Sequence, residues 1–135
     1  MTIGEAARRW ATTWNRAWAE KDVNAIVALY SDKVVYSSEP FRVPYLGLAG
    51  VREYVSTAFS EEGRITAVFG EPIVGGNGAS ISWWATLVEN GAEITLAGTS
   101  SLLFDPNGLV IEQWDTWNQA PGSVQASGWP FGGRR

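Results

Sequence analysis

The sequence predicts an α+β domain in which helices come first and an antiparallel sheet follows. In the N-terminal part, apolar residues recur at three- and four-residue steps, which is the spacing of amphipathic helices. From Arg64 onward the spacing changes to alternation, the period of half-buried strands. Asn90 and Gly91 join two of the alternating runs, and Asn-Gly in that position is the strongest short hairpin signal. This order predicts helices that cover one face of a curved, mostly antiparallel sheet.

Three helices are expected in the N-terminal part. The first carries an apolar stripe from Ile3 to Trp18. The second is short and begins after Asp22, which is a suitable N-cap residue. A strand over residues 33–38 and a loop with two prolines come next. The third helix presents its apolar residues at helical spacing: Val51, Tyr54, Val55, Ala58 and Phe59.

Four strand-like segments follow the helices, and Gly- and Asn-containing turns separate them. They cover residues 64–74, 79–89, 93–104 and 109–118. We expect a single domain over residues 1–118. Residues 119–135 are rich in Gly and Pro and lack periodicity, so they are predicted to form an irregular tail that wraps the surface.

The composition excludes several classes of function. The chain has 135 residues and a net charge of −4, and its basic residues form no stripe, so we expect no nucleic-acid partner. It has no cysteine and no histidine, which removes disulfides, Ser-His-Asp triads and nearly all transition-metal sites. We therefore expect no metal and no cofactor. No apolar run has the length of a signal peptide or a membrane span, which favours a cytoplasmic protein without a membrane partner.

A carboxylate stands between two tryptophans in the segment "EQWDTW", residues 112–117. One set of alternating residues in this strand would bury Glu112 and Asn118, so the other set is the better inner face: Leu109, Ile111, Gln113, Asp115 and Trp117. A bulge after the turn at residues 105–108 would reverse the two faces. If Asp115 points inward, it lies beside Gly98 or Ser100, with Trp83 across from Gly98.

Two interpretations of an inward Asp115 stay open. In the first, it is a general acid or base whose pKa is raised by an apolar pocket. In the second, it accepts hydrogen bonds and only orders the core.

The same alternation predicts a pocket for a small apolar or aromatic molecule around Asp115. Tyr36 and Tyr54 are candidate hydrogen-bond donors beside it. Arg42, in the proline-containing loop, either meets an anionic ligand at the pocket mouth or is a solvated loop residue. The tryptophans are either ligand contacts or core residues. The remaining candidates for the pocket lining are Trp14, Trp18, Ser38, Trp83, Ser100, Gln113 and Trp117.

The stretch "EKDVNAIVALYSDKVVYSSEP" followed by "GLAGVREYV", together with the order of elements, resembles the nuclear transport factor 2-like superfamily. That superfamily includes ketosteroid isomerases, SnoaL-like polyketide cyclases and limonene epoxide hydrolases. The resemblance implies a cone with a pocket at its wide end and a homodimer formed through the outer sheet face. Trp84, Val88 and Trp114 fall on that outer face and suggest the dimer contact.

The resemblance also separates the chemistries of the superfamily. The three positions that act in the isomerases hold Trp14, Ser38 and Ser100 here, so steroid isomerisation by that mechanism is not expected. The SnoaL-like cyclases place an acid/base aspartate on the final strand, and Asp115 matches that position, although their histidine is absent. We therefore expect a small-molecule-binding protein. If it is an enzyme, we expect a cofactor-free isomerase, cyclase or hydratase that acts on an uncharged, largely apolar substrate. The alternative is a non-catalytic binding protein or a dimeric structural module.

Overall fold

The computed structural model describes residues 1–131, which form helices packed against one mixed, mostly antiparallel sheet. The helices are α1 (Ile3–Glu20), α2 (Val23–Val27) and α3 (Gly47–Glu61). The strands are β1 (Tyr30–Ser37), β2 (Tyr45–Leu46), β3 (Glu62–Phe69), β4 (Ile73–Gly75), β5 (Gly78–Glu89), β6 (Ala92–Phe104) and β7 (Val110–Pro121). Within residues 1–131, no helix is long and apolar enough to cross a membrane.

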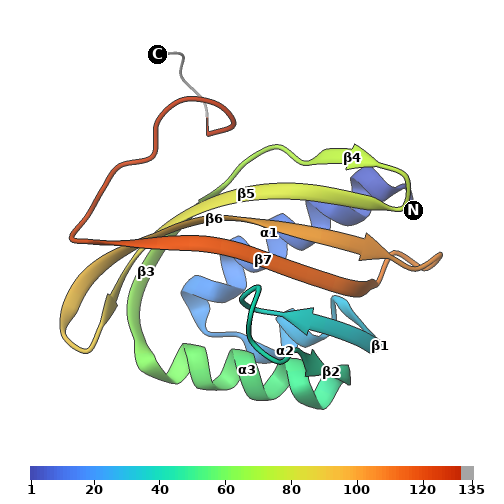
Figure 1. Cartoon of the computed structure of the whole chain (residues 1–135), viewed down its shortest axis with the longest axis horizontal. Helices are drawn as coiled ribbons and strands as arrows, with labels where there is room; N and C mark the ends of the chain where they lie inside the picture. The colour runs from blue at the N-terminus through green and yellow to red at the C-terminus, as the bar shows by residue number, and fades with distance from the viewer. Residues whose placement is uncertain (132–135) are drawn as a thin grey trace.

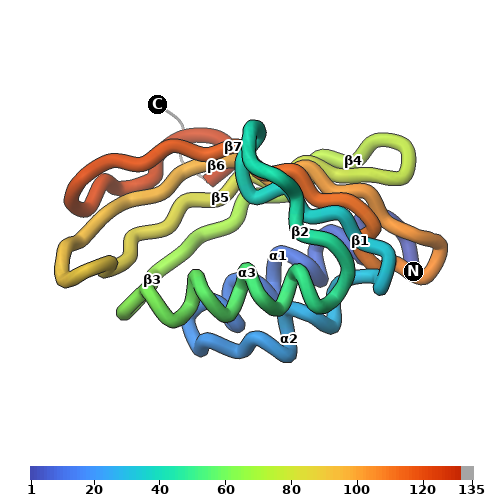
Figure 2. The backbone as a smooth tube through the Cα atoms, turned by 60° about the horizontal axis from the view of Figure 1, so that its bottom comes forward, coloured from blue at the N-terminus to red at the C-terminus, as the bar shows by residue number. Residues whose placement is uncertain are grey.

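The sheet is strongly curved, and all three helices lie on its concave side (Figure 1, Figure 2). The strand order is β2-β1-β7-β6-β5-β3, and β4 pairs with the first residues of β5 on the same edge as β3. Strands β1 and β7 run parallel, and the other paired strands are antiparallel. The predicted α+β class and the predicted cone are confirmed.

The helix ends follow the local signals in the sequence. Thr2 and Glu5 form a capping box at the start of α1, with the Glu5 amide donating to Thr2 Oγ1 at 3.0 Å. Asp22 caps α2 as predicted, since its Oδ1 accepts from the Ala25 amide at 3.1 Å. Local side-chain bonds of this kind are readable from the sequence because both partners lie within one turn.

The apolar stripe of α1 faces the sheet. Trp10, Trp14 and Trp18 are buried, and the small side chain of Ala17 between them lets the helix approach its neighbours closely. Trp10 packs edge-on against Phe69 of β3 at 5.8 Å between ring centroids. Helix α1 therefore brings a row of indole rings into the concave side of the sheet.

The first two predicted strands differ in extent from the prediction. Strand β1 begins at Tyr30, earlier than predicted, because Tyr30 pairs with Val110 of β7 instead of continuing α2. The predicted strand over residues 64–74 is divided into β3 and β4. Pro72 lies in the break and has no N–H to donate to a neighbouring strand.

The first part of β7 contains a bulge that the alternation did not locate. Phe104 pairs with Val110 and Leu103 with Glu112, so Ile111 is an extra residue in β7. The predicted inner positions of Leu109 and Ile111 are therefore wrong, and Val110 is buried in their place. After the bulge, the predicted assignment of residues to the inner face is right, and Asp115 lies on that face opposite Ser100.

The C-terminal segment crosses the outer face of the sheet, opposite the helices (Figure 2). Strand β7 continues to Pro121, so the irregular part begins later than residue 119. The Trp84 indole donates to the Val124 carbonyl at 2.7 Å and meets the ring of Phe131 edge-on. The chain itself thus covers part of the predicted dimer surface, while Trp114 stays 47% exposed. The homodimer remains a prediction, and residues 132–135 of the predicted tail lie outside the described residues.

Candidate functional site

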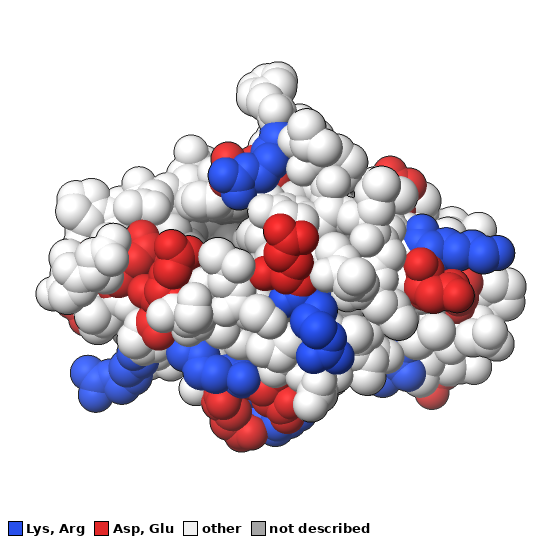
Figure 3. Space-filling view, turned by 90° about the horizontal axis from the view of Figure 1, so that it is seen from below, with Lys and Arg blue, Asp and Glu red and all other residues white. Residues whose placement is uncertain are grey.

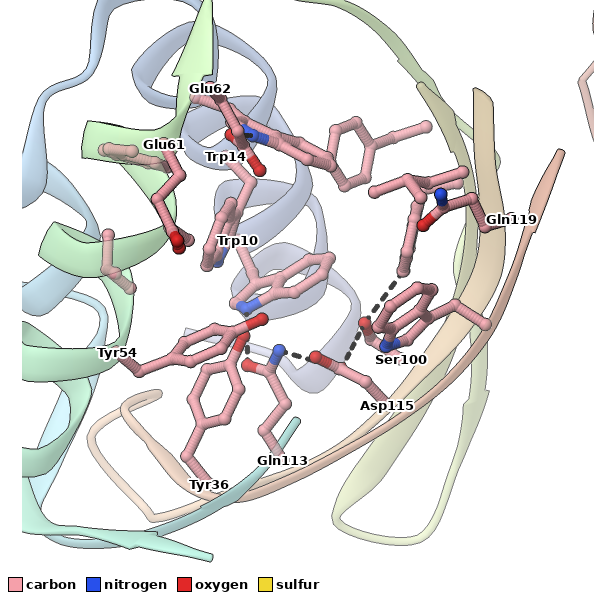
Figure 4. A pocket seen from close by; sticks show the side chains of 18 of the residues that line it. Trp10, Trp14, Tyr36, Tyr54, Glu61, Glu62, Ser100, Gln113, Asp115 and Gln119 are labelled. Atoms are coloured by element: carbon pink, nitrogen blue, oxygen red, sulfur yellow. Dashed lines mark hydrogen bonds between the residues drawn. The ribbon is translucent and has the colours of Figure 1, made fainter. Parts of the chain in front are cut away.

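A cavity of about 220 Å³ lies between α1, α3 and the concave face of the sheet. Indole and phenyl rings line much of its wall: Trp10, Trp14, Trp18, Phe59, Phe69, Trp83 and Trp117. Several of these rings meet nearly at right angles, for example Trp14 and Trp18 at 85° and Trp18 and Trp83 at 78°. A smaller set of polar side chains gathers on one side (Figure 4): Tyr36, Tyr54, Ser100, Gln113 and Asp115. This combination is typical of a small-molecule site.

Asp115 is 5% exposed, and its carboxyl group lies among these aromatic rings. Its Oδ1 accepts a hydrogen bond from Ser100 Oγ at 2.7 Å and another from Gln113 Nε2 at 3.0 Å. Ser100 faces Asp115 because the two residues are paired across β6 and β7. Gln113 lies on the same face of β7, two residues earlier. Strand pairing and alternation therefore place both donors against one oxygen.

Gln113 is itself held by the aromatic residues behind it. Its Oε1 accepts from the Tyr30 hydroxyl at 2.5 Å and from Trp10 Nε1 at 3.2 Å. The Tyr30 oxygen in turn accepts from Trp14 Nε1 at 3.2 Å. The Asp115 carboxyl is thus the end of a buried hydrogen-bond network that begins on α1.

Tyr30→Phe should lower the free energy of unfolding by about 1–3 kcal/mol, because it leaves the buried Trp14 N–H without its acceptor and Gln113 without one donor. Urea denaturation at pH 7 measures this. Tyr45→Phe is the matched control, since the Tyr45 hydroxyl makes no hydrogen bond within residues 1–131, and it should change stability by less than about 0.5 kcal/mol. Equal losses in the two variants would contradict a stabilising role for the network.

Burial raises the pKa of Asp115 to about 6. The hydrogen bonds from Ser100 and Gln113 act in the opposite direction, as does the Tyr36 hydroxyl, which faces the same carboxyl group. A carboxyl group with a pKa in this range is mostly ionised at pH 7 and can still take up a proton readily. Asp115 is therefore suited to proton transfer near neutral pH.

Tyr36 and Tyr54 reach toward Asp115 from β1 and α3 (Figure 4). Burial raises the pKa of both hydroxyls, and the nearby Asp115 carboxylate raises it further. Both groups therefore stay protonated at neutral pH and are hydrogen-bond donors. Their rings lie 5.1 Å apart between centroids, which holds the two side chains together.

Acidic side chains lie at the opening of the cavity. Glu61, Glu62 and Glu89 belong to its lining, and Figure 3 shows acidic side chains gathered beside a hollow in the surface. Burial raises the pKa of Glu62, while the hydrogen bond from Trp18 Nε1 at 2.8 Å and the charge of Lys21 oppose that change. Within residues 1–131, no group of three or more acidic side chains is placed to hold a metal ion.

Most of the residues predicted for the site do line this cavity: Trp14, Trp18, Tyr36, Tyr54, Trp83, Ser100, Gln113, Asp115 and Trp117. Two predicted residues do not. Ser38 is buried behind the wall, where its carbonyl accepts from Trp117 Nε1 at 2.9 Å. Arg42 is exposed in the loop between β1 and β2 and is not part of the lining. Strand β1 ends at Ser37, so the residues after it leave the inner face.

The sequence prediction missed Trp10, Phe69, the three glutamates and Tyr30. Trp10 could have been included, since it lies one helical turn before Trp14 on the same stripe. Tyr30 had a weaker signal. In a continuous strand, Tyr30 and Tyr36 would point to the same face. The strand must then be extended back through residues that also fit the end of a helix. The role of Tyr30 rests on contacts with α1 and β7 that are distant in the sequence.

Comparison with known proteins agrees with this architecture. The chain has the fold of the nuclear transport factor 2-like α+β proteins, with an aromatic cavity under the sheet. The SnoaL-like domain family matches residues 11–113, and the chain belongs to that family. A search of curated proteins found no match.

Three solved structures illustrate the fold. The epoxide hydrolase/cyclase-like enzyme SalBIII, associated with pyran ring formation in the polyether salinomycin, is 18% identical with a TM-score of 0.76, over 90% of this chain and 100% of that chain. A nuclear transport factor 2-like protein of unknown function from an Exiguobacterium species is 14% identical with a TM-score of 0.71, over 84% and 98% of the two chains. A protein with a ketosteroid isomerase-like fold from Catenulispora acidiphila, in complex with trimethylamine, is 14% identical with a TM-score of 0.70, over 85% and 86%. At these identities the likeness establishes the fold.

Proposed function

We propose that this protein binds a small, largely apolar or aromatic molecule in the cavity, and that Asp115 accepts a proton from it or donates one to it. The observation that carries the proposal is the buried Asp115, 5% exposed, whose carboxyl group lies among aromatic rings with its pKa raised to about 6. This chemistry is that of a cofactor-free isomerase, cyclase or hydratase.

The lining of the cavity supports an apolar ligand. Indole and phenyl rings line much of the wall, and contact with such rings buries the apolar surface of a ligand, which is the main source of affinity in such sites. The volume of about 220 Å³ limits the ligand's size. An engineered cavity of about 150 Å³ holds benzene, so a molecule of one or two rings fits here.

The polar side of the cavity supports proton transfer. At pH 7 most of Asp115 is ionised and can act as a base, while the fraction that is protonated can act as an acid. Tyr36 and Tyr54 stay protonated and can donate hydrogen bonds to an oxygen that gains negative charge. No cofactor is needed for a proton transfer of this kind.

Binding without turnover is the second candidate, and the hydrogen bonds of Ser100 favour it. Its hydroxyl accepts from Trp83 and donates to Asp115, so its only proton is used within the protein and holds the carboxyl group in place. A carboxylate held in this way can serve only to order the pocket.

The Asp115→Asn variant separates the two candidates once a converted compound has been found by screening. A proton-transfer enzyme should lose about 10²-fold or more in kcat. The wild-type rate should rise with pH around a midpoint near 6 if Asp115 acts as a base. Glu53→Gln, a carboxylate-to-amide change on the exposed side of α3, is the control and should leave the rate unchanged. Unchanged turnover in Asp115→Asn would exclude the catalytic role. Ligands that quench tryptophan fluorescence without being converted would favour the second candidate.

A further inference from the structure

The hydrogen bonds behind Asp115 run in one direction only. An indole N–H can donate but never accept, so each tryptophan fixes which way its partner's proton points. Trp83 Nε1 donates to Ser100 Oγ at 3.0 Å, and the Ser100 proton is then directed to Asp115 Oδ1 at 2.7 Å. This is the first of two donor chains that end on the same oxygen.

The second chain starts on α1. Trp10 and Trp14 both direct their N–H groups at the Tyr30 oxygen, at 3.3 and 3.2 Å, so the Tyr30 proton goes to Gln113 Oε1. With its oxygen occupied by donors, the Gln113 amide must turn its NH₂ group to Asp115 Oδ1. If the Gln113 amide turned over, its NH₂ group would face the Trp10 and Tyr30 donors, and its oxygen would face the Asp115 carboxylate.

These two chains leave few polar atoms for a ligand. The other indoles with hydrogen-bonded N–H groups in the lining are Trp18 and Trp117, which donate to Glu62 and to the Ser38 carbonyl. Among the described residues, Ser100 and Gln113 both donate to Asp115 Oδ1 and not to Oδ2. The Tyr36 hydroxyl faces the same carboxyl group from the cavity side, and the Tyr54 hydroxyl lies beside it (Figure 4). The inner end of the cavity therefore presents one strong acceptor beside two donors, surrounded by aromatic rings (Figure 4).

We propose that the ligand of this cavity is an uncharged alcohol or phenol of one or two rings, whose hydroxyl donates to Asp115 Oδ2 and accepts from Tyr36 or Tyr54. This inference rests on the proposed binding of a small apolar molecule in the same cavity. A hydroxyl group has one proton and two lone pairs, which matches one acceptor and two donors. It also needs no counter-charge in an apolar site.

Other polar groups fit these atoms less well. A ketone brings no proton for Oδ2, and a buried carboxylate is left with an unused acceptor. An ammonium group pairs with Asp115 but offers no lone pair to the tyrosine hydroxyls. An anion meets Asp115 at the inner end and the glutamates at the opening.

The test uses four compounds with one indane body: 1-indanol, 1-indanone, 1-aminoindane and indane-1-carboxylate. Isothermal titration calorimetry at pH 8 measures their affinities for the wild-type protein. 1-Indanol should bind about tenfold more tightly than 1-indanone, which corresponds to one hydrogen bond to a charged acceptor. It should also bind more tightly than the amine and the carboxylate.

Asp115→Asn gives a sharper result because the donor chains dictate how the new amide sits. Ser100 and Gln113 still direct their protons at the former Oδ1 position, so the amide oxygen occupies it and the NH₂ group takes the place of Oδ2. The acceptor at the Oδ2 position becomes a donor, so the preference should shift toward 1-indanone. The variant should bind 1-indanone at least as tightly as 1-indanol. Glu53→Gln is the control and should keep the wild-type order, since Glu53 is exposed on α3.

Each outcome decides the question. Equal affinity of the wild type for 1-indanol and 1-indanone, or an unchanged preference in Asp115→Asn, overturns the inference and leaves small-molecule binding intact. Tightest binding of 1-aminoindane also overturns it, in favour of a cationic ligand. Absence of binding by all four compounds, confirmed by unchanged thermal unfolding in their presence, contradicts the proposed binding function itself.

Discussion

Gly98→Val is expected to lower the free energy of unfolding by about 3 kcal/mol or more, as severe overpacking does. A Cβ at this position would lie 2.3 Å from the Thr116 carbonyl oxygen and 2.6 Å from Trp117 Cβ. Both atoms belong to β7, which cannot withdraw without breaking its pairing with β6. Trp83 fills the space over Gly98 from the other side, on β5. Urea denaturation at pH 7 measures the loss.

Gly75→Val is the matched control for this prediction. Gly75 lies in the edge strand β4, and a Cβ there would meet nothing within 4 Å. Its free energy of unfolding should change by less than about 0.5 kcal/mol. A small effect at position 98, or an equally large one at position 75, would show that the close approach of β6 and β7 at Gly98 is not required.

The stability of the fold should fall as the pH rises from about 4 to 7, by up to about 3 kcal/mol from Asp115 alone. The pKa of this carboxyl group is raised from 3.8 to about 6 in the folded protein. Between these two values the folded state binds the proton more tightly than the unfolded state does. The stabilisation is fully present below the unfolded pKa and is lost as the pH rises through the folded pKa. Urea denaturation at half-unit steps of pH measures the slope.

Asp115→Asn isolates this contribution because asparagine does not titrate. Glu62, whose pKa burial also raises, contributes in the same direction and is present in both proteins. The free energy of unfolding of the wild type, relative to that of the variant, should therefore fall between pH 4 and pH 7. Parallel curves over that range would mean that Asp115 has an ordinary pKa in the folded protein and would remove the main support for acid–base chemistry.

Local periodicity explains what the sequence predicts well. The stripe of α1, the cap at Asp22 and the Asn90-Gly91 hairpin depend on neighbours in the chain, and all three are present. The hairpin fixes the register of β5 and β6, so Trp83 lies opposite Gly98 as predicted. The inward position of Asp115 agrees with the alternation predicted for the part of β7 that follows the bulge.

Contacts between distant segments explain what the sequence does not predict. The bulge at Ile111 is visible only once β7 is paired with β6. Ser38 and Arg42 do not line the cavity, because the chain leaves the inner face after Ser37. Tyr30 joins α1 to β7 through three hydrogen bonds, none of them to a neighbour in the sequence.

The bulge at Ile111 divides β7 into two parts that can change separately. Before it, Val110 contributes to the hydrophobic core near the start of β1, and after it Gln113 and Asp115 belong to the cavity. Because of the extra residue, the inward and outward positions before the bulge do not determine those after it. The inward direction of Asp115 depends on its pairing with Ser100 and not on the turn that precedes β7. Insertions in the turn at residues 105–108 can therefore accumulate in relatives of this protein, or be introduced by design, without turning the acidic group of the cavity outward.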